Sequence, residues 1–95
     1  MSVDRGALLG ALGRAQQLTA DAVAANPTSQ LFGGIANQLR AIRQDVERGG
    51  PFDPSIQARV TLGVLAVREF EQTDPEYADL LHEINFQYRY EGVVR

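Results

Sequence analysis

The chain has 95 residues, 44% of them hydrophobic, a formal net charge of −3 and no cysteine. This length and composition describe one domain that buries roughly 60 to 65% of the surface its unfolded chain exposes. The lack of cysteine excludes disulfides and thiolate metal sites, and it fits a reducing cytoplasm. No segment approaches the ~18 apolar residues of a membrane span, and no basic start precedes an apolar run at the N-terminus. We therefore expect a cytoplasmic protein that makes no membrane contact.

Two amphipathic helices are expected in the first half of the chain, over residues 4–25 and 29–48. Their apolar residues recur at steps of three and four, which places them on one face of each helix. The first face comprises Leu8, Leu12, Ala15, Leu18 and Ala22, and the second comprises Leu31, Ile35, Leu39, Ile42 and Val46. A proline follows each predicted helix within three residues, which fits these two ends.

A third helix is expected over residues 54–72, with Asp53 as its N-cap and Pro54 at its first position. Apolar residues surround this helix instead of keeping to one stripe, and a helix of this kind is usually buried on all sides. We therefore expect it at the centre of the bundle, with Gly63 allowing a neighbour to approach closely. The alternative is that one face stays exposed for a partner.

A fourth helix is expected over residues 75–90, where Asp74 caps the start and Pro75 takes the first helical position. Its core face comprises Tyr77, Leu80, Leu81, Ile84 and Tyr88. Phe86 lies about 160° from that face on a helical wheel, and it shares the back of the helix with His82 and Tyr90. Large aromatic side chains on a polar face are candidate contacts for a partner, unless this helix is covered on both sides.

The negative charge is concentrated in the second half of the chain. Residues 49–95 hold four arginines and eight acidic residues. Between residues 69 and 79 the acidic residues have no basic residue among them, and they are Glu69, Glu71, Asp74, Glu76 and Asp79. Such a surface repels phosphates and attracts basic partners, so nucleic acid binding is disfavoured. The same charges also suit an acidic turn that interacts only with water.

The sequence contains no constellation suited to catalysis or cofactor binding. His82 is the only histidine, and no serine lies within a nucleophile motif. Asp79, His82 and Glu83 have ligand-like spacing on one helix, but a di-metal bundle needs a second such motif. Neither glycine pair is followed by a Walker lysine, so nothing supports a phosphate site. We therefore expect no enzymatic activity, no cofactor and no metal.

The stretch from Arg59 to Glu76, which reads RVTLGVLAVREFEQTDPE, resembles part of a known family. Its T-L-G, A-V-R-E-F and T-D-P-E segments are similar to those of small immunity proteins of bacterial type VI secretion that neutralise NAD(P)-degrading toxins. Local helix capping is by itself a sufficient reason for the T-D-P-E segment. The resemblance implies a helical protein in the cytoplasm of the toxin-producing cell. There it would bind a secreted NAD(P)+ glycohydrolase domain and block the active site.

These patterns predict an all-α single domain over residues 1–95, built as a bundle of four antiparallel helices joined by short loops. We expect a binding protein with a protein toxin as its partner and with no nucleic acid or membrane partner. The expected toxin contacts are Glu69, Glu71, Asp74 and Glu76 for steering and polar contact, with Tyr77, Phe86 and Tyr90 as anchors. The alternative is a homodimeric helical adaptor that buries the spare face of the third helix, or the Phe86 face, against its own copy.

Overall fold

The first two helices begin at side chains that cap their free N–H groups. In the computed structural model, which describes residues 4–91 without the side chains of residues 90 and 91, α1 spans Arg5–Ala25 and α2 spans Gln30–Arg48. The Asp4 carboxylate accepts a hydrogen bond from the third N–H of α1 at 3.0 Å, and the Ser29 hydroxyl accepts one from the third N–H of α2 at 3.3 Å. Both helices match their predicted bounds within one residue.

The apolar faces of α1 and α2 pack together and form one half of the core. The predicted face of α2 is buried at Ile35, Leu39, Ile42 and Val46. In α1 the prediction is wrong at one position, because Leu18 is 38% exposed while the next residue, Thr19, is buried. The Thr19 hydroxyl donates to the Ala15 carbonyl at 2.7 Å and hydrogen-bonds with the Tyr77 hydroxyl at 2.6 Å. These bonds satisfy the polar atoms that burial would otherwise leave unpaired.

The predicted third helix is broken at Val60 and Thr61. The segment instead forms α3 (Pro54–Arg59), α4 (Leu62–Leu65) and the π-helical turn η1 (Ala66–Phe70). Gln38 of α2 holds the break, because its Oε1 accepts the Thr61 N–H at 2.9 Å while its Nε2 donates to Thr61 Oγ1 at 2.8 Å. The prediction of one helix over residues 54–72 is wrong, since a tertiary contact replaces part of the helical hydrogen bonding at two β-branched residues of low helix propensity.

One face of α4 and η1 is open to solvent. Leu62, Ala66 and Phe70 are buried, whereas Val64 and Val67 are 56% and 52% exposed. The prediction that this segment is buried on all sides is therefore wrong, and its alternative of one exposed face is confirmed. The reason is the position of α4 and η1 at the edge of the bundle, with α5 as their main neighbour.

The last helix comprises α5 (Pro75–Phe86) and the π-helical turn η2 (Gln87–Glu91). Asp74 caps α5 as predicted, because its carboxylate accepts a hydrogen bond from the Tyr77 N–H at 3.3 Å. The buried residues are Tyr77, Ala78, Leu81, Ile84 and Tyr88. Phe86 is 52% exposed, so the prediction that it points away from the core is confirmed.

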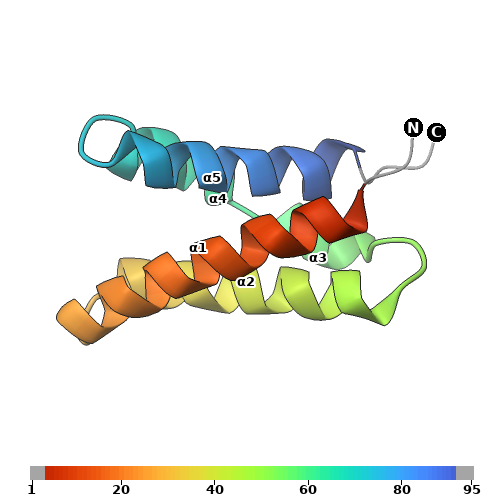
Figure 1. Ribbon diagram of the computed structural model, residues 1–95, viewed down its shortest axis with the longest axis horizontal. Helices are drawn as coiled ribbons and strands as arrows, with labels where there is room; N and C mark the ends of the chain where they lie inside the picture. The colour runs from red at the N-terminus through yellow and green to blue at the C-terminus, as the bar shows by residue number, and fades with distance from the viewer. Residues whose placement is uncertain (1–3, 92–95) are drawn as a thin grey trace.

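The helices assemble into the all-α bundle that the sequence predicts, with the third helix divided. α1 packs along both α2 and α5, and α4 with η1 packs against α5 (Figure 1). The turn from η1 to α5 and the loop from α2 to α3 lie at opposite ends of the bundle (Figure 1). In the described range 4–91, no helix has the length and apolar character needed to cross a membrane.

A buried carboxylate joins α2 to the start of α3 and to η2. Asp45 is 3% exposed, and its Oδ2 accepts hydrogen bonds from the Tyr88 hydroxyl at 2.5 Å and from the Asp53 N–H at 2.8 Å. Its Oδ1 pairs with Arg48. Burial by itself raises the pKa of Asp45, but these hydrogen bonds together outweigh burial and hold the pKa below its ordinary value. The ionised carboxylate therefore fixes both segments against α2.

Candidate binding surface

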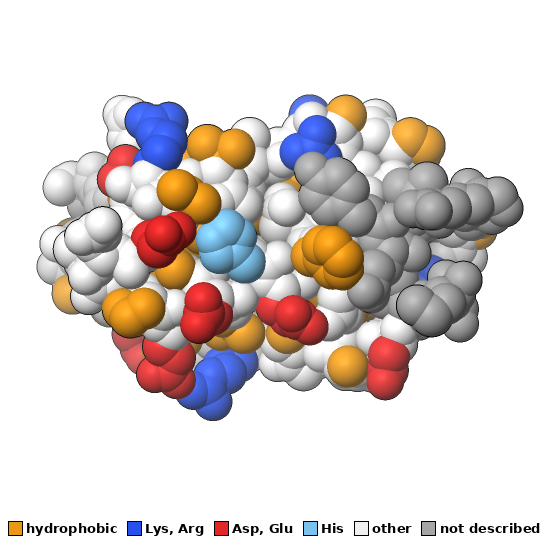
Figure 2. Space-filling model, turned by 90° about the horizontal axis from the view of Figure 1, so that it is seen from above, with side chains coloured by type: hydrophobic (Ala, Val, Ile, Leu, Met, Phe, Trp, Pro, Cys, Tyr) orange, Lys and Arg blue, Asp and Glu red, His pale blue; other side chains and the backbone are white. Residues whose placement is uncertain are grey.

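Five acidic side chains gather around the turn that joins η1 to α5. This acidic turn comprises Glu69, Glu71, Asp74, Glu76 and Asp79, and all five residues are exposed. The fold brings them together because only four residues separate the end of η1 from the start of α5, with the Asp74 N–H donating to the Phe70 carbonyl at 2.8 Å. Figure 2 shows acidic side chains over the left and lower parts of this face, beside exposed hydrophobic ones. The geometry therefore supports the predicted negative surface.

A basic residue of α1 reaches one edge of the acidic turn. Arg14 pairs with Glu76 at 2.5 Å, with side chains that are 63% and 74% exposed. Sequence reasoning missed this pair because the two residues are 62 positions apart. Such an exposed pair contributes little to stability, but it offsets the charge of Glu76. The Glu69 carbonyl accepts a hydrogen bond from the Thr73 hydroxyl, but the carboxylates of Glu69 and Glu71 have no hydrogen-bond or ion-pair partner within the described part of the chain, so they carry uncompensated charge.

The three predicted aromatic anchors differ in how far the structure supports them as surface contacts. Phe86 is half-exposed on α5, where a partner can reach it. Tyr77 is only 4% exposed, and its ring packs edge-on against Phe70 with centroids 4.9 Å apart. Burial raises the pKa of Tyr77, against the effect of the hydrogen bond with Thr19. The prediction of Tyr77 as a surface anchor is therefore corrected to a core residue, while the side chain of Tyr90 lies outside the described residues.

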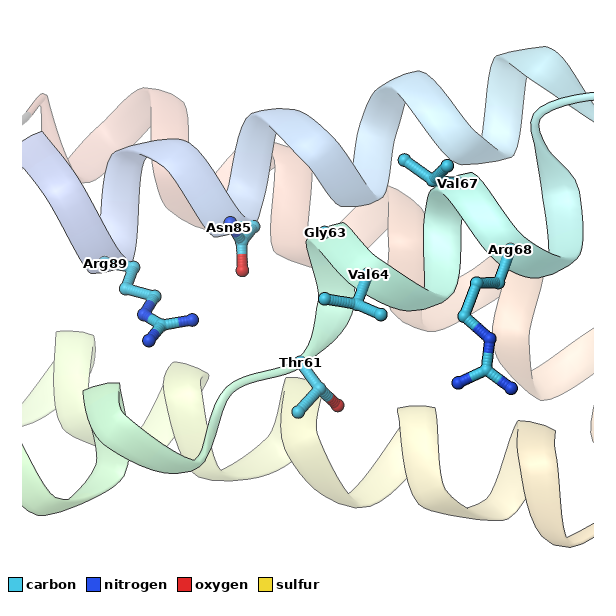
Figure 3. A pocket seen from close by; sticks show the side chains of 7 residues that line it. All are labelled: Thr61, Gly63, Val64, Val67, Arg68, Asn85 and Arg89. Atoms are coloured by element: carbon cyan, nitrogen blue, oxygen red, sulfur yellow. The ribbon is translucent and has the colours of Figure 1, made fainter.

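A groove that the sequence did not predict lies between α4, η1 and the end of the last helix. It has a volume of about 400 Å³ and is open on one side. Its lining residues are Thr61, Gly63, Val64, Val67, Arg68, Asn85 and Arg89 (Figure 3). The break at Val60 and Thr61 turns α4 away from α3 and thereby shapes one end of the groove. The signal that could have revealed it is the pair Val64 and Val67, three residues apart on one helix face.

Gly63 sets how closely the two walls of the groove approach. A Cβ atom at this position would lie 2.9 Å from Nδ2 of Asn85 and 3.2 Å from its Cγ. Any larger residue would therefore displace Asn85, which confirms the prediction that Gly63 allows a neighbour to approach closely. Among the described residues, no group of three or more His, Cys, Asp or Glu side chains is placed to hold a metal ion.

The fold and these surfaces define a small helical binding protein, with an acidic turn and an apolar groove as its two exposed features. A family model described as Tsi6 matches residues 7–90. The chain therefore belongs to the Tsi6 family of immunity proteins. The match covers far more of the chain than the stretch from Arg59 to Glu76, and it confirms the resemblance that this stretch shows.

Individual relatives give the same result. The chain is 37% identical over 70 residues to the immune protein Tsi6 of Pseudomonas aeruginosa, which covers 74% of this chain and 73% of the relative. A structure of Tse6 in complex with Tsi6 matches with a TM-score of 0.78 and 32% identity, covering 90% of this chain and 89% of the matched one. A structure of Tsi6 from Pseudomonas aeruginosa matches with a TM-score of 0.73 and 29% identity, covering 100% and 88%. These matches confirm the predicted fold class.

Proposed function

We propose that this chain is an immunity protein that binds a cognate secreted toxin and blocks its active site inside the producing cell. The observation that carries the proposal is the structural match to Tsi6 in its complex with Tse6, which extends over nine tenths of the chain. We further propose that the toxin is an NAD(P)+ glycohydrolase, that binding takes place in the cytoplasm, and that the chain itself catalyses no reaction.

The charge of the acidic turn supports this proposal physically. A pocket that holds the pyrophosphate of NAD(P)+ must be electropositive, so its rim attracts a negatively charged surface. Complementary charge of this kind raises the association rate more than it lowers the dissociation rate. The half-exposed ring of Phe86 supplies apolar area on the same helix, and buried aromatic contacts mainly slow dissociation. We therefore expect the acidic turn to act mainly on the association rate and Phe86 mainly on the dissociation rate.

Complex formation is the first test of the proposal. The purified protein is mixed with the toxin domain encoded beside its gene, and the mixture is separated by size-exclusion chromatography with light scattering. We expect a stable complex with one copy of each chain. Separate elution of the two proteins, together with a dimer of this chain alone, would instead favour the homodimeric adaptor.

Reversing the charge of Glu71 is expected to slow association with the toxin by about 3- to 10-fold at low salt. Glu71→Arg suits this test because the side chain is exposed and makes no contact that the fold needs. Asp74 is less suitable, since it caps α5. Glu47→Arg makes the same change of charge in the last turn of α2, at the other end of the bundle from the acidic turn, and it serves as the control. It also removes the ion pair of Glu47 with Arg43 at 3.5 Å, so its melting temperature is compared with wild type first. Stopped-flow association at several ionic strengths measures the effect, and an unchanged rate with unchanged salt dependence would contradict steering by this surface.

Removing the ring of Phe86 is expected to weaken toxin binding by about tenfold or more, mainly through faster dissociation. Because the side chain is 52% exposed, Phe86→Ala should leave the melting temperature nearly unchanged. Leu18→Ala, which shortens another partly exposed apolar side chain on α1, is the control. Dissociation rates from surface plasmon resonance decide the matter. Wild-type affinity in a folded Phe86→Ala protein would remove this residue from the interface.

A further inference from the structure

The groove exposes apolar side chains that the core does not need. Val64 and Val67 are 56% and 52% exposed, side by side on the outer face of α4 and η1. Figure 3 shows both among the labelled side chains on the α4 side of the groove, while Asn85 and Arg89 come from the opposite wall. Neighbouring apolar residues in a concave surface often contribute a large share of the binding energy at a protein interface.

The charge of the groove is opposite to that of the neighbouring acidic turn. Arg68 and Arg89 line it, and no acidic residue does among the side chains that the structure describes. Arg89 donates to the Val60 carbonyl at 3.3 Å, so its position is fixed by the helix break. The Arg68 side chain makes no hydrogen bond or ion pair within the described residues, which leaves its guanidinium ready for a carboxylate.

The groove also contains a buried acceptor without a donor. Oδ1 of Asn85 is inaccessible to solvent and has no hydrogen-bond partner among the described residues. The other end of its amide faces Gly63, so the side chain has little room to turn. Figure 3 shows the oxygen directed toward the space between the two walls. An unsatisfied buried acceptor is costly, but this oxygen is closed to a bound chain as well as to water, so it carries no part of the binding argument.

We propose that this groove receives an acidic segment of the same toxin whose binding is proposed above. A carboxylate of that segment pairs with Arg68, and aliphatic groups cover Val64 and Val67. This inference rests on the proposed function and adds a second contact of opposite charge. The acidic turn begins at Glu69, directly after Arg68, so one partner surface spans both features without a gap.

Two other occupants fit the groove less well. A second copy docked by a two-fold axis would place the arginines of one groove against those of the other, which is unfavourable. A small molecule would remain largely exposed because the groove is open on one side, whereas ligand sites usually enclose most of their ligand. An acidic protein segment satisfies both the charge and the apolar surface. It also gives specificity, because a wrong toxin would place like charge against Arg68.

Charge reversal at Arg68 tests this inference, because the direction of the change in affinity shows whether the partner surface over the groove is acidic or basic. If the partner surface over the groove is acidic, Arg68→Glu weakens binding of the adjacent-encoded toxin domain by about 10- to 100-fold. If a basic partner surface covers it, the same change strengthens binding. Arg40→Glu alters the net charge equally at an exposed position of α2 outside the groove, and its affinity should stay close to wild type. Val67→Asp is the second groove variant, with an expected loss of similar size.

Each outcome of this experiment has a defined meaning. Weaker binding by both groove variants, with Arg40→Glu unaffected and circular dichroism unchanged, supports an acidic segment in the groove. Wild-type binding by both variants overturns the groove inference while the proposed function stands. A groove variant that dissociates a wild-type dimer but still binds toxin also overturns it, in favour of a second copy. If the wild-type protein does not bind the toxin, the proposed function fails first.

Discussion

Replacing Asp45 with alanine is expected to lower the free energy of unfolding by about 3 kcal/mol, because it leaves buried donors without an acceptor. The hydroxyl of Tyr88 is fully buried and donates to Asp45 at 2.5 Å, and the Asp53 N–H donates to the same oxygen at 2.8 Å. Neither donor has another hydrogen-bond acceptor among the described residues. Urea denaturation at neutral pH measures the loss. A decrease below about 0.5 kcal/mol would mean that water replaces the carboxylate.

The same residue gives the protein a defined response to acid. Because the folded state holds the pKa of Asp45 below its unfolded value, near 3.8, the ionised carboxylate stabilises the fold above that pH. This stability is lost as the pH falls from about 4 through the folded pKa. The difference in unfolding free energy between wild type and Asp45→Asn should therefore shrink between pH 5 and the most acidic measurable pH. Parallel pH profiles for the two proteins would contradict the assignment.

Truncating Phe70 is expected to cost about 3 to 4 kcal/mol of stability, whereas truncating its neighbour Val67 costs less than about 0.5 kcal/mol. Phe70 is 7% exposed, stacks against Phe32 with centroids 5.7 Å apart, and meets the ring of Tyr77 at 4.9 Å. Val67 is 52% exposed on the other side of the same turn. Thermal unfolding of Phe70→Ala and Val67→Ala compares the two faces directly. Equal losses would show that Val67 is covered in the folded monomer.

Local sequence patterns predicted the parts of the fold that local hydrogen bonds and one apolar face determine. α1, α2 and α5 begin directly after Asp4, Ser29 and Asp74, because each of these side chains accepts a hydrogen bond from the first turn of its helix. Periodicity then selected the buried face of α2 correctly. These features depend on residues within four positions of one another, so they can be predicted from short segments of the sequence.

The errors arose where distant residues decide the structure. The break at Thr61 depends on Gln38, which is 23 positions away and makes two hydrogen bonds to Thr61, one as donor and one as acceptor. Thr19 replaces Leu18 in the core because the Tyr77 hydroxyl reaches it from α5. Helical periodicity assigns a threonine to the polar face and does not show that a tyrosine at a core position needs a hydrogen-bond partner. It therefore does not reveal that the hydroxyls of Thr19 and Tyr77 bond to each other.

The sequence predicted only part of the candidate surface, because the rest depends on contacts between residues far apart in the chain. The acidic turn and the exposure of Phe86 follow from sequence neighbours and the helical repeat. The pairing of Arg14 with Glu76 and the groove beside Gly63 require contacts between separate helices. The exposed face of α4 has a simple cause, since the break ends α3 and places Val64 and Val67 at the edge of the bundle. The residues that prevented a continuous third helix therefore also create the groove.

The most direct test of the account is the consumption of NAD(P)+ by the toxin domain encoded beside this gene. The rate is followed with increasing amounts of the purified protein, up to a molar excess. We predict that inhibition rises in proportion to the added protein and is complete near one equivalent. An unchanged rate of NAD(P)+ consumption, with toxin and protein both folded, would contradict the proposed neutralisation of this toxin.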